Sequence, residues 1–374
     1  MLNVIGFIKK KSIEQLIETY SLQYRKHSKY PNLIQLMYDQ LDTPKNDITN
    51  NCRGLIIDTD TLEVISFPFI RFDDYDPDKP VVDFDNCTFW HKLDGSIMTV
   101  YWYKDAWHVA SKGMPDASGK IKNLDITMND YFWQVWKSKG YEYPKCKRHC
   151  YIFELTRPSE DFLVKTTKPE ITFIGCRSLN TFNEIAINEA SRKWNLTWTM
   201  VVAKPKATLT DILKELVEVD PILMEGYVAC DSNFNRVKMK SPQYEEINML
   251  RTRRYLSDED YEKKKAQIQK DNFRRMCGIV RTNQHKSFLK LDKYKEHVEL
   301  YERVYQAHIR LKQRLLTLFK WTETLSGKEL GLKLQSNKEL SGIVFAYQKG
   351  VIQSLDDYLR AMPIKRYESL LQLK

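Results

Sequence analysis

The sequence predicts an α+β protein in which a strand-rich part of the chain is followed by a helical part. Between residues 52 and 240, short runs of β-branched and aromatic residues alternate with turn signals, which is the pattern of strands. After Pro242 only one more proline occurs, Pro363, and apolar residues recur at helical spacing. The chain of 374 residues is long enough for two cores. We therefore expect two domains, 1–243 and 244–374.

Charge is divided unevenly between these two parts. Residues 245–374 contain 27 Lys+Arg and 17 Asp+Glu, and the remaining 32 basic and 32 acidic residues, within 1–244, cancel. The whole net charge of +10 therefore belongs to the C-terminal part. A basic surface attracts polyanions, so we expect this part to bind one. A solvated helical face is the alternative explanation.

The cysteines and the hydropathy exclude other classes of protein. Seven cysteines are an odd number scattered along the chain, so we expect no disulfide framework and a reducing compartment, namely the cytoplasm. The segment from Cys146 to Cys150 contains His149 but has no second ligand cluster at a suitable spacing, so no zinc site is predicted. No apolar run approaches the roughly 20 residues of a membrane span.

The first elements can be placed in order along the chain. Spaced apolar residues predict a helix over 13–40, and a polar loop follows it. The runs 52–57 and 63–67, separated by Asp58-Thr59-Asp60-Thr61, predict a hairpin. A further strand is expected at 81–84. Farther on, the spacing of apolar residues predicts a helix over 208–218, and after it helices over 261–276 and around 298–309.

The stretch Trp90-His91-Lys92-Leu93-Asp94-Gly95-Ser96 carries the strongest chemical signal. It places Lys92 just ahead of an Asp-Gly turn, and the strand-like run 97–103 follows. A lysine held on rigid backbone near other cations can be present as a neutral amine and act as a nucleophile. Gly95, which lacks a Cβ, lets backbone come close to a ligand. The alternative is a surface hairpin with a solvated lysine.

Three later strands carry polar residues that could serve the same site. The run 107–111 ends in Ser111-Lys112-Gly113, and the run 150–155 places Glu154 on the face opposite Phe153. In Val237-Lys238-Met239-Lys240 the two lysines share one face of a strand, which suits a phosphate better than a core. For Glu154 a structural ion pair is the alternative.

Taken together, these motifs resemble the covalent nucleotidyltransferases, and most closely the RNA ligase 1 family of bacteriophages, which repairs broken tRNA. The resemblance rests on the order and spacing of the matching residues: Arg53-Gly54, Lys92-x-Asp94-Gly95, Lys112, Phe153-Glu154, Glu225-Gly226 and Lys238-x-Lys240. DNA ligases and capping enzymes continue into a small five-stranded domain after this point. The helical, basic end of this chain is similar to the phage enzymes instead. The resemblance implies an adenylyltransferase domain of antiparallel sheets with flanking helices, followed by an all-helical RNA-binding domain.

The family also implies roles for individual residues. Lys92 would be the nucleophile, and Lys112, Lys238 and Lys240 would assist the reaction. Nucleotide binding is implied for the remaining matched residues: Arg53 and Arg71 at the phosphates, Asp94 and Gly95 in the turn, Glu154 at the ribose, Phe173 against the base and Glu225 beside a divalent cation. For Phe173, an ordinary core position explains the sequence equally well.

The activity expected from this resemblance is ATP-dependent RNA strand joining. Its cofactors would be ATP and Mg²⁺ or Mn²⁺, and its partner an RNA with 5′-phosphate and 3′-hydroxyl ends, including nicked tRNA. An mRNA capping-type guanylyltransferase would load GTP onto the same lysine. A non-catalytic RNA-binding protein on the same fold is the other alternative, although binding alone does not require several cations around one amine.

Overall fold

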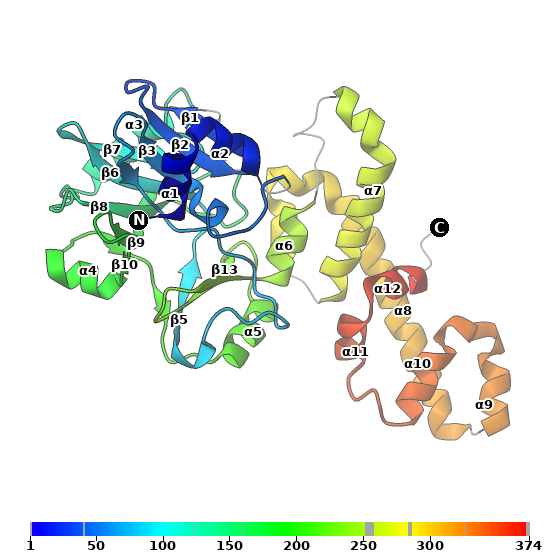
Figure 1. Cartoon of the computed structure of the whole chain (residues 1–374). Helices are drawn as coiled ribbons and strands as arrows, with labels where there is room; N and C mark the ends of the chain where they lie inside the picture. The colour runs from blue at the N-terminus through cyan, green and yellow to red at the C-terminus, as the bar shows by residue number, and fades with distance from the viewer. Residues whose placement is uncertain are drawn as a thin grey trace. The chain divides into compact units, whose positions relative to one another are not determined.

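Strands in the first part of the chain and helices in the second define the architecture in the computed structural model (Figure 1). The structure describes residues 2–39, 42–122, 124–159, 161–250, 258–282, 286–325 and 327–371. The chain folds into two compact units. The first comprises Met1–Ile212 and Gly226–Met239, and the second comprises Leu213–Glu225 and Lys240–Lys374. The predicted domain boundary between 243 and 244 lies inside helix α6, Pro242–Asn248.

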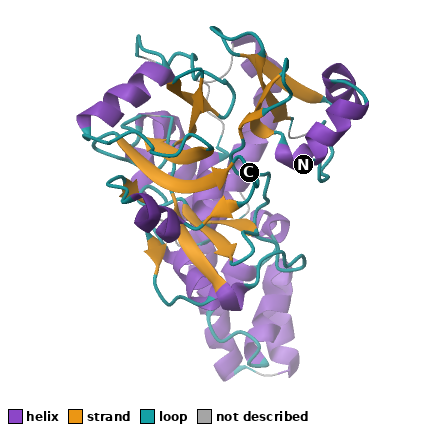
Figure 2. Cartoon of the chain, turned by 60° about the vertical axis from the view of Figure 1, so that its left-hand side comes forward, coloured by secondary structure: helices purple, strands orange, loops and turns teal. Residues whose placement is uncertain are grey.

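The strands, orange in Figure 2, form three sheets. The first has the order β1-β2-β3-β4 and is antiparallel throughout. Its strands are β1 (Leu22–Lys26), β2 (Leu33–Tyr38), β3 (Arg53–Asp58) and β4 (Val64–Ser66). Helices α1 (Asn3–Lys10) and α2 (Ile13–Tyr20) pack against this sheet and share one apolar core with it.

This first sheet corrects one prediction and confirms another. The predicted helix over 13–40 is wrong beyond Tyr20, because Ser21 adopts a left-handed conformation, with φ 51°, and ends α2. The chain then forms the β1–β2 hairpin, whose second strand is completed by pairing with β3. The hairpin predicted from 52–57 and 63–67 is confirmed as β3 and β4.

The second sheet has the order β10-β9-β8-β6-β7, and β11 pairs with β9 in parallel. Its strands are β6 (Ser96–Tyr103), β7 (Ala106–Ser111), β8 (His149–Thr156), β9 (Glu170–Ser178), β10 (Glu184–Ile185) and β11 (Thr199–Met200). Helices α3 (Met128–Ser138) and α4 (Ile187–Trp194) pack against this sheet. The core of this layer is aromatic: Phe132, Trp136, Phe153, Phe173 and Trp198 pack against one another.

The third sheet has the order β12-β5-β13-β14. Its strands are β5 (Cys87–Lys92), β12 (Ala203–Lys204), β13 (Gly226–Asp231) and β14 (Arg236–Lys240), and α5 (Leu209–Glu218) confirms the helix predicted over 208–218. The strand predicted at 81–84 is wrong. The Asp83 carboxylate accepts a hydrogen bond from the Asp85 amide and starts a 3₁₀ turn, Phe84–Asn86, so the strand begins only at Cys87.

The described residues that follow α6 are helical or lie in connections between helices. The helices are α7 (Asp258–Arg281), α8 (Val298–Thr324), α9 (Gly327–Lys333), α10 (Lys338–Gln348), α11 (Leu355–Ala361) and α12 (Ile364–Leu370), yellow to red in Figure 1. Short 3₁₀ turns at Lys286–Lys290, Asp292–His297 and Leu334–Asn337 connect them. Strand β14 gives way to helix because Ser241 caps the Tyr244 amide and Pro242 occupies the first helical turn.

The α+β class with antiparallel sheets and a helical C-terminal region is therefore confirmed. All seven cysteines are free, in agreement with the predicted absence of disulfides. Within the described residues, no helix is both long enough and apolar enough to cross a membrane.

Candidate active site

Lys92 lies where the chain passes from one sheet to another. It is the last residue of β5 in the third sheet, and Leu93-Asp94-Gly95 then leads directly into β6 of the second sheet. Because β5 and β6 do not pair with each other, the Asp-Gly sequence is not the turn of a surface hairpin. In the third sheet, Lys92 of β5 pairs with Gly226 of β13.

The connection after Lys92 is held by two contacts with the second sheet. A Cβ placed on Gly95 would lie 2.6 Å from the carbonyl oxygen of Leu155 and 3.1 Å from the side chain of Glu154, so only glycine fits there. The Asp94 carboxylate accepts hydrogen bonds from the amides of Leu163 and Val164, at 2.9 and 3.0 Å. Asp94 therefore binds the loop after β8 in this structure, whereas its predicted role was nucleotide binding.

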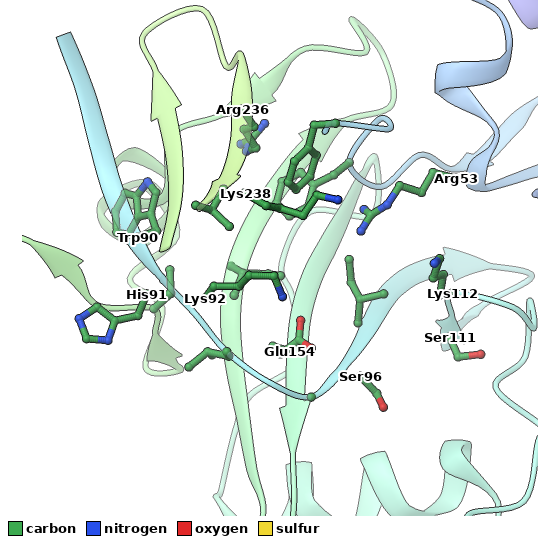
Figure 3. Close-up of a pocket in the computed structure, with 18 of the residues that line it drawn as sticks. Arg53, Trp90, His91, Lys92, Ser96, Ser111, Lys112, Glu154, Arg236 and Lys238 are labelled. Atoms are coloured by element: carbon green, nitrogen blue, oxygen red, sulfur yellow. The ribbon is translucent and has the colours of Figure 1, made fainter. Parts of the chain in front are cut away.

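A cavity of about 510 Å³ opens beside Lys92, within the usual size range of small-molecule sites. The described residues that line it carry five lysine and arginine side chains and one carboxylate: Arg53, Lys92, Lys112, Arg236, Lys238 and Glu154. Figure 3 shows the Lys92 amine, the Glu154 carboxylate and the Arg53 guanidinium turned toward the same space, with His91 pointing away. Such a surplus of cations suits an anionic ligand such as a nucleoside triphosphate.

Lys112 and Arg53 approach the cavity from the second and first sheets. Lys112 follows the last residue of β7, and Arg53 opens β3. Burial lowers the pKa of Lys112, and the positive charges of Arg53 and Arg71 lower it further. Burial also lowers the pKa of Arg53, while Tyr38 and Glu154 oppose that shift. The Arg53 guanidinium lies 5.4 Å from the ring centre of Phe72.

Lys238 comes from β14, the edge strand of the third sheet. Arg236, Lys238 and Lys240 are partly exposed while Val237 and Met239 are buried, so the predicted common face of the two lysines is confirmed. The backbone of Lys238 pairs with residues 73–75, because its amide donates to Asp73 O and its carbonyl accepts from the Tyr75 amide. Its ammonium lies 3.7 Å from Asp74 Oδ1.

Arg236, which was not predicted, is a further cation of the lining and is held by an ion pair. Its two terminal nitrogens donate to the two carboxylate oxygens of Glu184, at 2.9 and 2.6 Å, and its guanidinium lies 4.4 Å from the ring centre of Phe69. Phe69 in turn covers Gly175, where a Cβ would meet the ring at 2.4 Å. The position of Arg236 two residues before Lys238 places it on the same strand face and could have identified it. Glu184 has no comparable signal in the sequence.

Several other predicted residues do not line the cavity. Phe173 is fully buried against Phe153 and Trp198, and its neighbour Ile174 contributes to the lining instead. The structure therefore places Phe173 in the core, the alternative that the sequence left open. The pairing of β8 and β9 is irregular here, because Phe153 lies opposite Phe173 and Ile152 opposite Gly175, which leaves Ile174 without an opposite residue. The Arg71 guanidinium lies 4.1 Å from the ring centre of Tyr38, and its positive charge lowers the pKa of Lys112.

Glu225 and Lys240 are also absent from the lining. Glu225 is 5 % exposed, and its backbone carbonyl accepts a hydrogen bond from the Ser241 amide at 2.9 Å. The Lys240 ammonium lies 3.6 Å from Glu245 Oε1. Among the described residues there is no group of three or more His, Cys, Asp or Glu side chains that could hold a metal by itself.

Comparison with known proteins places the chain among sequences similar to RNA ligases, the class of enzyme that the motifs indicate. It is 27% identical over 200 residues to an RNA ligase of Rhodothermus phage RM378, an alignment that covers 43% of this chain and 45% of that protein. It is 22% identical over 316 residues to a putative bifunctional polynucleotide kinase/RNA ligase of Autographa californica nuclear polyhedrosis virus, covering 78% of this chain and 42% of that protein. The chain thus spans less than half the length of both relatives. No family model matches the sequence.

Solved structures show only a distant likeness. A Naegleria gruberi RNA ligase with PPi aligns with a TM-score of 0.34 at 19% identity, covering 44% of this chain and 52% of that one. Another structure of that ligase, a mutant with ATP and Mn, aligns with a TM-score of 0.32 at 17% identity, covering 44% and 52%.

Proposed function

We propose that this protein is an ATP-dependent RNA ligase that joins RNA 5′-phosphate and 3′-hydroxyl ends. The observation that carries the proposal is the setting of Lys92, whose amine points into a cavity with four further cations, beside one carboxylate. The sequence similarity to phage and viral RNA ligases supports it independently. A module that only bound RNA would not need an amine surrounded by cations.

The reaction would proceed in three transfers in one cleft. The Lys92 amine attacks the α-phosphorus of ATP, a P–N bond forms, and pyrophosphate leaves as the P–O bond breaks. An oxygen of the RNA 5′-phosphate then takes the AMP from Lys92. Finally, the RNA 3′-hydroxyl attacks that 5′-phosphate, the phosphodiester bond forms, and AMP leaves.

Other residues of the cavity would bind and neutralise the substrate. Arg53, Lys112 and Lys238 surround the space where phosphate oxygens would lie, and cations fixed before the reaction stabilise charge that develops in the transition state. Glu154, an acceptor only, would bind ribose hydroxyls. We retain Lys240 as a further cation, together with Arg71, Asp94 and Gly95 as parts of the nucleotide site.

A divalent cation, Mg²⁺ or Mn²⁺, would supply charge neutralisation on the phosphates. The described residues include no group of three ligating side chains that could form a closed metal site. They fit a weakly held ion, because Mg²⁺ takes few protein ligands and completes its coordination with phosphate oxygens and waters. Glu154 lines the cavity and is one candidate to hold it, and we retain Glu225 as the other.

We assign RNA binding to the helical, basic residues 244–374 and adenylyl transfer to residues 1–243. Nicked tRNA is the substrate we propose, and the free cysteines fit a reducing compartment such as the cytoplasm.

One experiment tests the chemistry. The protein is incubated with labelled ATP or labelled GTP and a divalent metal, and a covalent adduct is sought on a denaturing gel. We expect label from ATP, in a bond that is stable to alkali and labile to acid, as a phosphoramidate is. Preferential labelling by GTP would favour a capping-type guanylyltransferase, and no labelling by either would favour a binding protein.

A further inference from the structure

Gln35 is a buried amide behind the cavity, at a position where the sequence pattern offers no reason for a polar residue. It lies in the middle of β2 between Ile34 and Leu36, and all three side chains are buried, Gln35 with 1 % exposed. A buried amide destabilises the fold unless its polar atoms are hydrogen-bonded. Its contacts therefore indicate what it contributes.

The amide joins two segments that carry cations of the cavity. Gln35 Nε2 donates a hydrogen bond to the backbone carbonyl of Ser111 at 2.9 Å, directly before Lys112. The same nitrogen lies 3.4 Å from where a Cβ on Gly54 would be, and Gly54, with φ +92°, directly follows Arg53. The side chain thus bridges the beginning of β3 in the first sheet and the end of β7 in the second sheet.

Two polar atoms beside this bridge have no protein partner. Gln35 Oε1 and Arg53 Nη1 are both buried without a hydrogen bond. Both residues line a small cavity of about 10 Å³, together with Thr99, Ser111, Lys112 and three apolar or glycine positions. That volume is about what one water molecule needs, and a buried water is stable where two to four polar groups can bond it.

A purely structural role would explain only half of these observations. The backbone carbonyl of Ser111, at the end of β7, needs a hydrogen-bond donor, and Gln35 Nε2 supplies it. That role does not explain why the acceptor Oε1 and the donor Arg53 Nη1 are both left without a protein partner in two residues that line the same water-sized cavity. An acceptor, a water and a donor in sequence satisfy both atoms and fix the guanidinium.

We propose that Gln35 is a positioning residue of the nucleotide site, holding the Lys112 segment directly and the Arg53 guanidinium through one bound water. The inference rests on the proposed function, in which Arg53 and Lys112 bind the phosphates of ATP. Gln35 itself does not touch the nucleotide and lies outside the lining of the main cavity.

The test compares two buried glutamines that each donate one hydrogen bond to a backbone carbonyl. Gln243 is 3 % exposed, donates through Nε2 to the Val217 carbonyl at 2.8 Å, and also leaves its Oε1 unpaired, but it does not line either cavity. Gln35→Leu and Gln243→Leu therefore remove equivalent hydrogen bonds. The rate of adduct formation is measured against ATP concentration for each full-length variant, together with its melting temperature.

We expect both variants to melt at lower temperature, but only Gln35→Leu to raise the KM for ATP, by about tenfold or more, because supporting residues typically have effects of that size.

Gln35→Glu is the second variant, for use if the leucine variant does not fold. Glutamate has nearly the same shape as glutamine and keeps an acceptor for Arg53, but it loses the donor to Ser111 O, so the KM for ATP should also rise. A folded Gln35 variant with a KM within about twofold of the unmodified protein, or an equal rise in Gln243→Leu, would overturn the inference. Failure of the unmodified protein to form any adduct would instead overturn the proposed function.

Discussion

The turn at Gly95 lies directly against Leu155, because a Cβ on Gly95 would come 2.6 Å from the Leu155 carbonyl oxygen. The register of β6 and β8 continues this contact, with Ser96 opposite Leu155 and Ile97 opposite Glu154. The backbone after Lys92 is thereby placed against the strand that carries Glu154, the one carboxylate among the described residues that line the cavity. Adenylyl transfer by Lys92 should therefore depend on this close approach.

Gly95→Ala should separate the turn from β8. The added methyl group would meet backbone, which cannot rotate away, so the turn or the strand must shift. A displacement of about 1 Å can lower a reaction rate about 100-fold, and we expect a loss of that order in adduct formation. Gly119→Ala is the matched control, because no atom lies within 4 Å of its Cβ position. Equal activity of the two variants would show that the contact does not matter for the chemistry.

Lys92→Arg should abolish adduct formation and the joining of 5′-phosphate ends. Arginine keeps the positive charge but does not present a neutral amine near pH 7. The variant should still seal RNA that is supplied already adenylylated, since that step uses the cavity without the nucleophile. Lys104→Arg, at an exposed turn, is the control and should behave as the unmodified protein. An adduct on Lys92→Arg would mean that another lysine is the nucleophile.

The helical part should contribute most of the electrostatic attraction to RNA. Replacing exposed lysines by glutamine there should weaken RNA binding and flatten its salt dependence, by about 0.7 in the slope of log K against log salt for each lost contact. The four positions are Lys320, Lys328, Lys338 and Lys349. Filter binding of a nicked stem-loop at several salt concentrations measures the slope.

The control for this experiment replaces four exposed lysines of the first unit, namely Lys10, Lys26, Lys137 and Lys206. Both sets remove the same charge, so a general effect of net charge would act on them equally. The same loss of affinity and slope in both variants would contradict a specific RNA-binding role for residues 244–374.

Asp116 should make the fold of the first unit sensitive to acid. Burial by itself would raise the pKa of Asp116, but hydrogen bonds from Ser28 and Ser118 lower it to about 2, from 3.8. The two amides lie 2.9 and 3.1 Å from its oxygens. A lowered folded-state pKa stabilises the fold above the unfolded-state pKa, and this contribution is lost as the pH falls from about 4 to about 2.

Asp116→Asn should therefore lower the melting temperature at pH 7, and the difference from the unmodified protein should shrink as the pH falls through that window. Thermal unfolding followed by circular dichroism at pH 7, 5 and 3 checks this. Asp125→Asn, whose side chain is 93 % exposed, is the control and should show almost no difference. A constant difference between Asp116→Asn and the unmodified protein at all three pH values would show that the charge is not responsible.

Local patterns in the sequence were sufficient wherever one element decides its own conformation. The β3–β4 hairpin, the strand containing Glu154, the common face of Lys238 and Lys240, and α5 all follow from alternation or helical periodicity, which depend only on neighbouring residues. The same applies to Lys92, whose position beside an Asp-Gly turn is a feature of seven consecutive residues.

Where tertiary pairing decides, the sequence was insufficient. The residues of β2 form a short apolar run, a pattern that is compatible with a buried helix and with a buried strand. The run is a strand because it pairs with β1 and β3. Phe173 and Ile174 are both apolar, and only the sheet shows which of them faces the cavity.

Contacts between residues far apart in the chain define the rest of the site. Glu184 fixes Arg236, Gln35 reaches Ser111, and Gly95 meets Leu155. By itself, the sequence determined the candidate nucleophile, the class of fold and the division of charge, because those are properties of local order and composition. Only the tertiary structure decided which cations share a cavity with Lys92 and what holds them there, because those contacts arise when three separate sheets come together.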